Sequence, residues 1–184
     1  LERFVQYAVF ETTSDAPDYR DVLRWARLFA EEGCDGIVSV GGDGAAEMAK
    51  LIRLFSRLDD AEGYSRAKVR LTGVKHIAVP DGSGAGKEAI PEAVMVKDGK
   101  RERIAHPGLL PDIVLLEPKY MHMLEEEQNR SAVLDVVCRC IDSLWAVRSD
   151  DVSSAAAKEA LSAVLDNCFS FLNGDMGSAA KVMR

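Results

Sequence analysis

The stretch Gly36-Ile37-Val38-Ser39-Val40-Gly41-Gly42-Asp43-Gly44 decides the fold of this 184-residue chain. Its first five residues form a short apolar run, typical of a strand buried on both faces of a parallel sheet. The turn Gly41-Gly42-Asp43-Gly44 follows, and a helical pattern begins directly after it and runs to residue 58. The order of strand, glycine turn and helix predicts one βαβ step, with the helix N-terminus at the carboxyl edge of the sheet.

Further strands are predicted on both sides of this step. Residues 4–12 carry β-branched and aromatic side chains, while residues 75–80 and 113–116 are apolar runs typical of buried strands. Asp98-Gly99 separates two short alternating runs and predicts a hairpin. The strand at 75–80 enters a loop, residues 81–88, in which three glycines accompany Asp81 and Lys87, and this composition favours a loop that lines a ligand.

The remainder of the chain is predicted to be helical, over residues 124–147 and 152–172. The expected fold class is α/β, a partial Rossmann-like parallel sheet layer followed by an all-helical segment. We expect two domains, a truncated nucleotide-binding-like α/β domain at 1–118 and a helical domain remnant at 119–184.

The composition restricts the partners. A net charge of −7 repels phosphate backbones and anionic lipid, so we expect no nucleic acid and no membrane as the main partner. The apolar runs are far shorter than a membrane span. The four cysteines lack the spacing of a disulfide framework or a zinc site, which favours the reducing cytoplasm.

Three motifs together resemble the iron-containing alcohol dehydrogenases, which have the dehydroquinate-synthase-like fold. The glycine turn after the first apolar run resembles the family's Gly-Gly-Gly-Ser loop, and residues 104–112 resemble its Ile-Ala-Asp-Pro-x-Leu-Leu-Pro-Asp motif. The family's Pro-Thr-Thr-x-Gly-Thr-Gly-Ser-Glu-x-x-Pro motif aligns without gaps with Pro80-Asp81-Gly82-Ser83-Gly84-Ala85-Gly86-Lys87-Glu88-Ala89-Ile90-Pro91. The resemblance implies a divergent member truncated at both ends.

The metal-binding motif departs from the family pattern. The family's Asp-Ala-Leu-Thr-His, whose Asp and His bind the metal, matches Asp135-Val136-Val137-Cys138-Arg139 here. Since a guanidinium has no lone pair to give a metal, we expect no metal ligands in this chain. An alternative interpretation is that Asp135 and Arg139 form an ordinary ion pair one helical turn apart.

The nucleotide loops depart as well. The resemblance implies cofactor-binding positions, which we assign to Gly41, Gly42, Asp43, Gly44, Gly82 and Ser83. Asp43 and Asp81 replace a glycine and a threonine of the family, and a carboxylate beside a diphosphate costs about 1–4 kcal/mol. Lys87 partly offsets this cost. The sequence therefore predicts no bound cofactor, with NAD(P) as the alternative; Asp43 could also simply cap the helix.

We favour a non-redox enzyme that performs acid/base chemistry (elimination, dehydration, isomerisation or addition) on a small, anionic molecule. Carboxylates that face cations can transfer protons and hold a developing enolate. The alternative is an NAD(P)-dependent alcohol or aldehyde oxidoreductase, and a second alternative is a non-catalytic binding or assembly remnant. Because truncation would leave apolar faces uncovered, we also expect a homodimer or another homo-oligomer. The predicted catalytic residues are Asp81, Lys87, Asp135 and Arg139.

Overall fold

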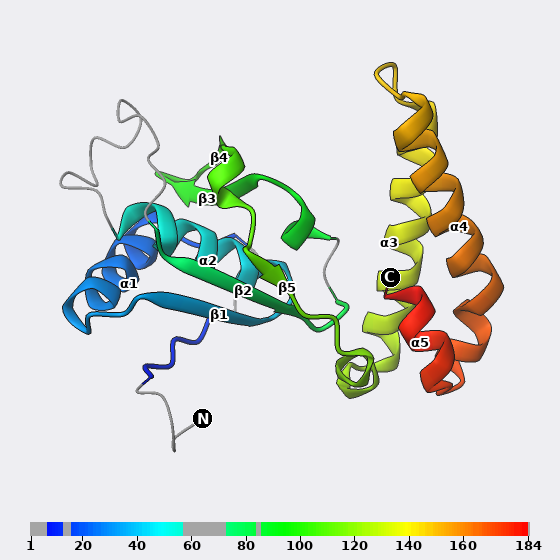
Figure 1. Cartoon of the computed structure of the whole chain (residues 1–184), viewed down its shortest axis with the longest axis horizontal. Helices are drawn as coiled ribbons and strands as arrows, with labels where there is room; N and C mark the ends of the chain where they lie inside the picture. The colour runs from blue at the N-terminus through cyan, green and yellow to red at the C-terminus, as the bar shows by residue number, and fades with distance from the viewer. Residues whose placement is uncertain (1–6, 13–15, 57–72, 84–85, 184) are drawn as a thin grey trace. The chain divides into compact units, whose positions relative to one another are not determined.

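A computed structural model describes residues 7–12, 16–56, 73–83 and 86–183. These residues separate into two compact units. Unit 1 contains the described residues up to 79 and residues 86–115, and unit 2 contains residues 80–83 and 116–183. The expected fold class is confirmed, since a parallel sheet layer is followed by helices (Figure 1).

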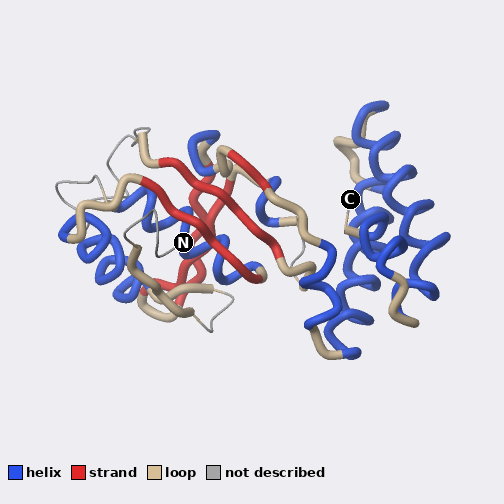
Figure 2. The backbone as a smooth tube through the Cα atoms, turned by 60° about the horizontal axis from the view of Figure 1, so that its bottom comes forward, coloured by secondary structure: helices blue, strands red, loops and turns tan. Residues whose placement is uncertain are grey.

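Unit 1 is built from two helices, a three-stranded sheet and a hairpin. Its helices and strands are α1 (Tyr19–Glu31), β1 (Gly36–Gly41), α2 (Asp43–Phe55), β2 (Lys75–Pro80), β3 (Glu92–Lys97), β4 (Lys100–Ala105) and β5 (Ile113–Val114), with short 3₁₀ turns η2 (Lys87–Ala89) and η3 (Pro107–Leu109). The sheet has the order β1-β2-β5, and β2 pairs in parallel with β5. Both helices lie on the same face of this sheet (Figures 1 and 2).

Helix α2 lies at the centre of unit 1. It begins at the predicted glycine turn and ends at Phe55, and it is buried along nearly its whole length. Leu51 and Phe55 join the apolar core with Val22 and Phe29 of α1 and Met95 of β3. A helix that is apolar on most of its circumference needs cover on several sides, and α1, the sheet and the β3–β4 hairpin provide it.

The hairpin is confirmed, whereas two strand predictions are wrong in part. Asp98 and Gly99 both adopt positive φ, as the tight turn between β3 and β4 requires. Residues 7–12 are not a strand; Phe10 instead packs its ring on Trp25 of α1, with the ring centroids 4.8 Å apart. The strand expected at residues 113–116 pairs with β2 only over Ile113–Val114.

The burial of β1 also differs from its prediction. Val38 and Val40 are 62% and 58% exposed, while Ser39 between them is buried. Alternate side chains of a strand point to opposite faces, so only one face of β1 is covered by the described residues. The apolar composition of β1 correctly predicted that the strand lies in a parallel sheet. It did not predict that only one face of the strand is covered.

Unit 2 is helical and packs around its own apolar cluster. It contains η4 (Pro118–Met123), α3 (Glu126–Trp145), α4 (Asp151–Leu172) and α5 (Met176–Val182). Met121, Val164 and Phe171 are among its buried residues. Each α-helix starts at an acidic cap, Glu125, Asp150 or Asp175. Among the described residues, no helix has the length and apolar character needed to cross a membrane.

Candidate functional site

The candidate site in unit 1 begins at the turn between β1 and α2. Gly41 has φ +128°, which side-chain-bearing residues rarely adopt, and Gly42 precedes the first helical residue, Asp43. As a glycine, Gly42 brings no side chain to cap the helix. Its carbonyl accepts from the N–H groups of Ala45 and Ala46. The turn thus places the first N–H groups of α2 at the carboxyl end of β1, where helix N–H groups can bind an anion.

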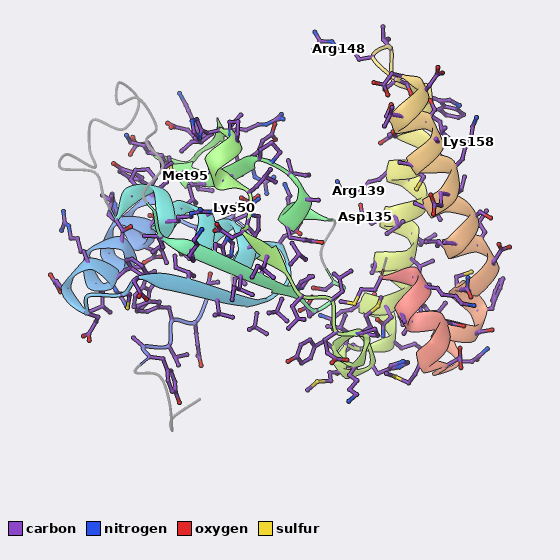
Figure 3. The ribbon with its side chains drawn as sticks, in the orientation of Figure 1. Lys50, Met95, Asp135, Arg139, Arg148 and Lys158 are labelled. Atoms are coloured by element: carbon purple, nitrogen blue, oxygen red, sulfur yellow. The ribbon has the colours of Figure 1, made fainter. Side chains whose placement is uncertain are left out.

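Lys50, about two turns into α2, is fully buried. Its ammonium donates three hydrogen bonds to backbone carbonyls, to Lys87 O at 2.7 Å, Ile90 O at 2.9 Å and Glu92 O at 2.8 Å. All three acceptors belong to the segment that leaves the second glycine loop. Figure 3 shows Lys50 directed into the interior of unit 1, in the same region as Met95.

Glu47 is also buried and lies one turn before Lys50 on α2. Its Oε2 accepts from the backbone N–H of Val94 at 2.9 Å. Its Oε1 forms an ion pair with Lys87 Nζ at 3.3 Å, and the Lys87 side chain remains 27% exposed. The predicted site residue Lys87 is therefore held by α2 at both its carbonyl and its ammonium group.

The charges around Lys50 nearly balance. Burial lowers the pKa of Lys50, and the Lys87 ammonium acts in the same direction, whereas the carboxylates of Glu47, Glu88 and Asp43 oppose the decrease. Lys87 and Glu47 thus belong to one charged cluster with Lys50. The roles that the sequence assigned to Asp43 and Lys87 stay predictions.

Asp81, Gly82 and Ser83 belong to unit 2. The Asp81 carboxylate accepts from the backbone N–H of Ser83 at 2.8 Å and from its hydroxyl at 2.6 Å, a local turn that shapes the loop. Gly82 has φ +87°, and a Cβ at this position would come within 2.5 Å of Met121 Cγ. The close packing on Met121 explains why this position is a glycine, and its assignment to cofactor binding stays a prediction.

Asp135 and Arg139 lie one turn apart on α3 and pair through Asp135 Oδ2 and Arg139 Nε at 2.8 Å (Figure 3). Both side chains are nearly half exposed. This is the ion pair that the sequence left open as the alternative interpretation. Within the described residues, no group of three or more His, Cys, Asp or Glu side chains is arranged to hold a metal ion. The absence of a metal at Asp135 stays a prediction.

The sequence reasoning missed Glu47 and Lys50. A signal was available: the two charges stand three residues apart in Ala45-Ala46-Glu47-Met48-Ala49-Lys50-Leu51, within a helix bounded by apolar strands. Charged residues are almost never fully buried unless they are paired. A central helix with a Glu and a Lys on one face therefore indicates a buried polar network.

The comparisons with known proteins agree with this geometry. The family model described as iron-containing alcohol dehydrogenase matches residues 1–118. A 4-hydroxybutyrate dehydrogenase of Cupriavidus necator is 30% identical over 150 residues, which cover 77% of this chain and 39% of the relative. An aldehyde-alcohol dehydrogenase 2 of Entamoeba histolytica is 25% identical over 97% of this chain and 22% of its own length.

Solved structures give the same result for the fold. The iron-containing alcohol dehydrogenase of Thermococcus thioreducens superposes with a TM-score of 0.84 at 25% identity, over 95% of this chain and 48% of that one. The sulfoacetaldehyde reductase of Bifidobacterium kashiwanohense, solved with NAD⁺, gives 0.88 at 21% identity, over 96% and 49%. This chain spans about half the length of these structures and less than that of the curated relatives. The chain belongs to the iron-containing alcohol dehydrogenase family.

Proposed function

We propose that this chain supplies the dinucleotide-binding turn of an NAD(P)-dependent alcohol or aldehyde oxidoreductase. The observation that carries the proposal is the turn Gly41-Gly42-Asp43-Gly44, placed between a parallel strand and the N-terminus of α2. The relatives named above are dehydrogenases and a reductase. The oxidoreductase alternative therefore has better support than the non-redox chemistry that the sequence favoured, and the expectation that no cofactor binds has none.

The residues of this turn are suited to bind the diphosphate of such a cofactor. The backbone N–H groups of the first turn of α2 would bind the diphosphate, helped by the positive end of the helix dipole. When bound, the nicotinamide cofactor would accept or give a hydride. The chain's own contribution at this turn is binding and orientation, with Lys87 as a nearby cation and Asp43 as an opposing charge.

Asp43 provides the test. A carboxylate beside a diphosphate costs about 1–4 kcal/mol, so its removal should tighten binding about fivefold or more. We therefore expect Asp43→Asn to lower the Kd for NAD⁺ or NADP⁺ in isothermal titration calorimetry. The matched control is Asp21→Asn, because Asp21 is an exposed acid in the first turn of α1.

Two results would contradict the proposal. One is wild-type protein that binds neither dinucleotide at millimolar concentration. The other is an unchanged affinity in the Asp43→Asn protein, which would place the diphosphate elsewhere.

A further inference from the structure

The backbone of the segment that follows the second glycine loop is attached to side chains of α2 at four points. Lys50 holds three of its carbonyl groups, and Glu47 holds the N–H of Val94. Glu47 and Lys50 are one helical turn apart and follow closely after the turn that opens α2. Residues 87–94 are thereby joined to the helix that the first glycine turn opens.

We propose that Glu47 and Lys50 are positioning residues that lock residues 87–94 to α2, so that Lys87 and the N-terminus of α2 reach the same diphosphate. This inference rests on the proposed function and adds residues that act through Lys87 rather than on the ligand. Glu47 and Lys50 are too deeply buried to contact a ligand themselves.

A lysine side chain is well suited to hold these three carbonyl groups. A charged ammonium has three hydrogens in tetrahedral directions, and here each one meets a carbonyl within 2.9 Å. A neutral amine would lose one donor, and the planar guanidinium of arginine has a different donor geometry. Three carbonyls that converge on one atom fix the direction of the backbone between residues 87 and 92.

Stability alone does not call for these charges. The burial of charged side chains costs free energy that hydrogen bonds and attraction must offset, and well-packed apolar side chains of similar volume are often as stable. An apolar pair would fill the space under the loop but would not define where its carbonyl groups point. Directional control of the loop is what the charged pair adds.

The same contacts with α2 restrain Lys87. Its carbonyl is bound to Lys50, and its ammonium lies 3.3 Å from Glu47. The ammonium is still partly exposed, so an anion can approach it. A cation that is already restrained loses less side-chain entropy when a ligand binds.

A double-mutant cycle tests the lock. We would compare wild type, Lys50→Met, Lys87→Met and the double variant by their Kd for NAD⁺, and measure amide hydrogen exchange over residues 86–96. Lys100→Met is the matched control, since Lys100 is an exposed lysine of the same unit. We expect Lys50→Met to speed exchange in this segment and to weaken NAD⁺ binding about tenfold. In the Lys87→Met background it should add almost nothing, because Lys50 acts through Lys87.

The outcomes separate the two proposals. Wild-type protein that binds neither NAD⁺ nor NADP⁺ refutes the proposed function, and hydrogen exchange then still decides whether Lys50 and Glu47 hold residues 87–94 in place. Additive losses in the cycle, or unchanged exchange and affinity in Lys50→Met, overturn the positioning role. Should Lys50→Met fail to fold, Glu47→Gln is measured in the same way. It keeps the size of the side chain and releases Lys87, and it must show the same faster exchange and the same non-additivity.

Discussion

The buried histidine of β2 gives a quantitative prediction about pH and stability. His76 is fully buried, and its Nε2 lies 2.8 Å from Ser39 Oγ. Burial lowers the pKa of His76 from 6.5 to about 4; the positive charges of Arg53 and Lys50 contribute to the decrease, and Asp112 opposes it. The ring is therefore neutral in the folded protein under physiological conditions.

The size of the effect follows from this difference. The unfolded chain binds a proton on His76 near pH 6.5, whereas the folded chain resists protonation until about pH 4. The stabilising contribution of the neutral ring is complete above pH 6.5 and is lost as the pH falls toward 4. One pKa unit corresponds to about 1.4 kcal/mol, so the loss amounts to about 3 kcal/mol.

Two measurements check this prediction. The ring protons of His76, assigned from their absence in a His76→Gln spectrum, should titrate near pH 4 in NMR. Urea unfolding of wild type and His76→Gln between pH 7.5 and 4 should show that wild type loses about 3 kcal/mol more than the variant. Carboxylates titrate in both proteins, and their contributions cancel in the comparison.

The prediction would be refuted by a ring that titrates near 6.5 in the folded protein. It would equally be refuted by parallel stability curves for wild type and His76→Gln. Either result would mean that water or a proton acceptor reaches Nδ1, for which the described residues offer no hydrogen-bond partner.

Three further predictions concern unit 2 and assembly. Gly82→Ala should lower the free energy of unfolding by about 1–3 kcal/mol in urea titration, because it combines a positive φ with a clash on Met121; Gly174→Ala, at φ +92° with open space around it, should cost less, and equal losses would rule out the clash. Removal of the exposed ion pair by Asp135→Ala or Arg139→Ala should change stability by about 0.5 kcal/mol or less, and elemental analysis should find no iron or zinc that depends on Asp135. Sedimentation should show a dimer or higher oligomer, and a clean monomer at micromolar concentration would contradict that expectation.

Local patterns predicted much of unit 1. The glycine turn before α2 and the Asp98-Gly99 hairpin turn were found because few backbone geometries use these residues, so a short stretch of sequence is sufficient to specify them. The assignment of Asp43 and Lys87 to one site rests on the general rule that the carboxyl ends of neighbouring parallel strands meet at one edge of a sheet, and it stays a prediction.

Features that depend on distant residues were not predictable in this way. The role of Lys50 depends on hydrogen bonds to carbonyl groups 37 to 42 residues later in the chain, and no local sequence pattern indicates these bonds. The exposure of Val38 and Val40 depends on which elements cover the second face of the sheet, which composition does not state. Asp135 and Arg139 were identified as a pair, because positions one turn apart on a helix are neighbours by geometry alone.

The capped helices α3, α4 and α5 have a consequence for the speed of folding. Each helix starts at its own acidic cap, and the hydrogen bonds within a helix join residues only four positions apart, so each helix can begin to form locally. Unit 1 instead needs contacts between residues far apart in sequence, because Ile77 of β2 pairs with Ile113 of β5 and Lys50 donates to the carbonyl of Glu92. Chains with local contacts fold in microseconds to milliseconds, and loop closure over longer separations is slower. Refolding from urea should therefore show a fast helical phase in circular dichroism, followed by a slower phase in which the sheet and the buried lysine reach their partners.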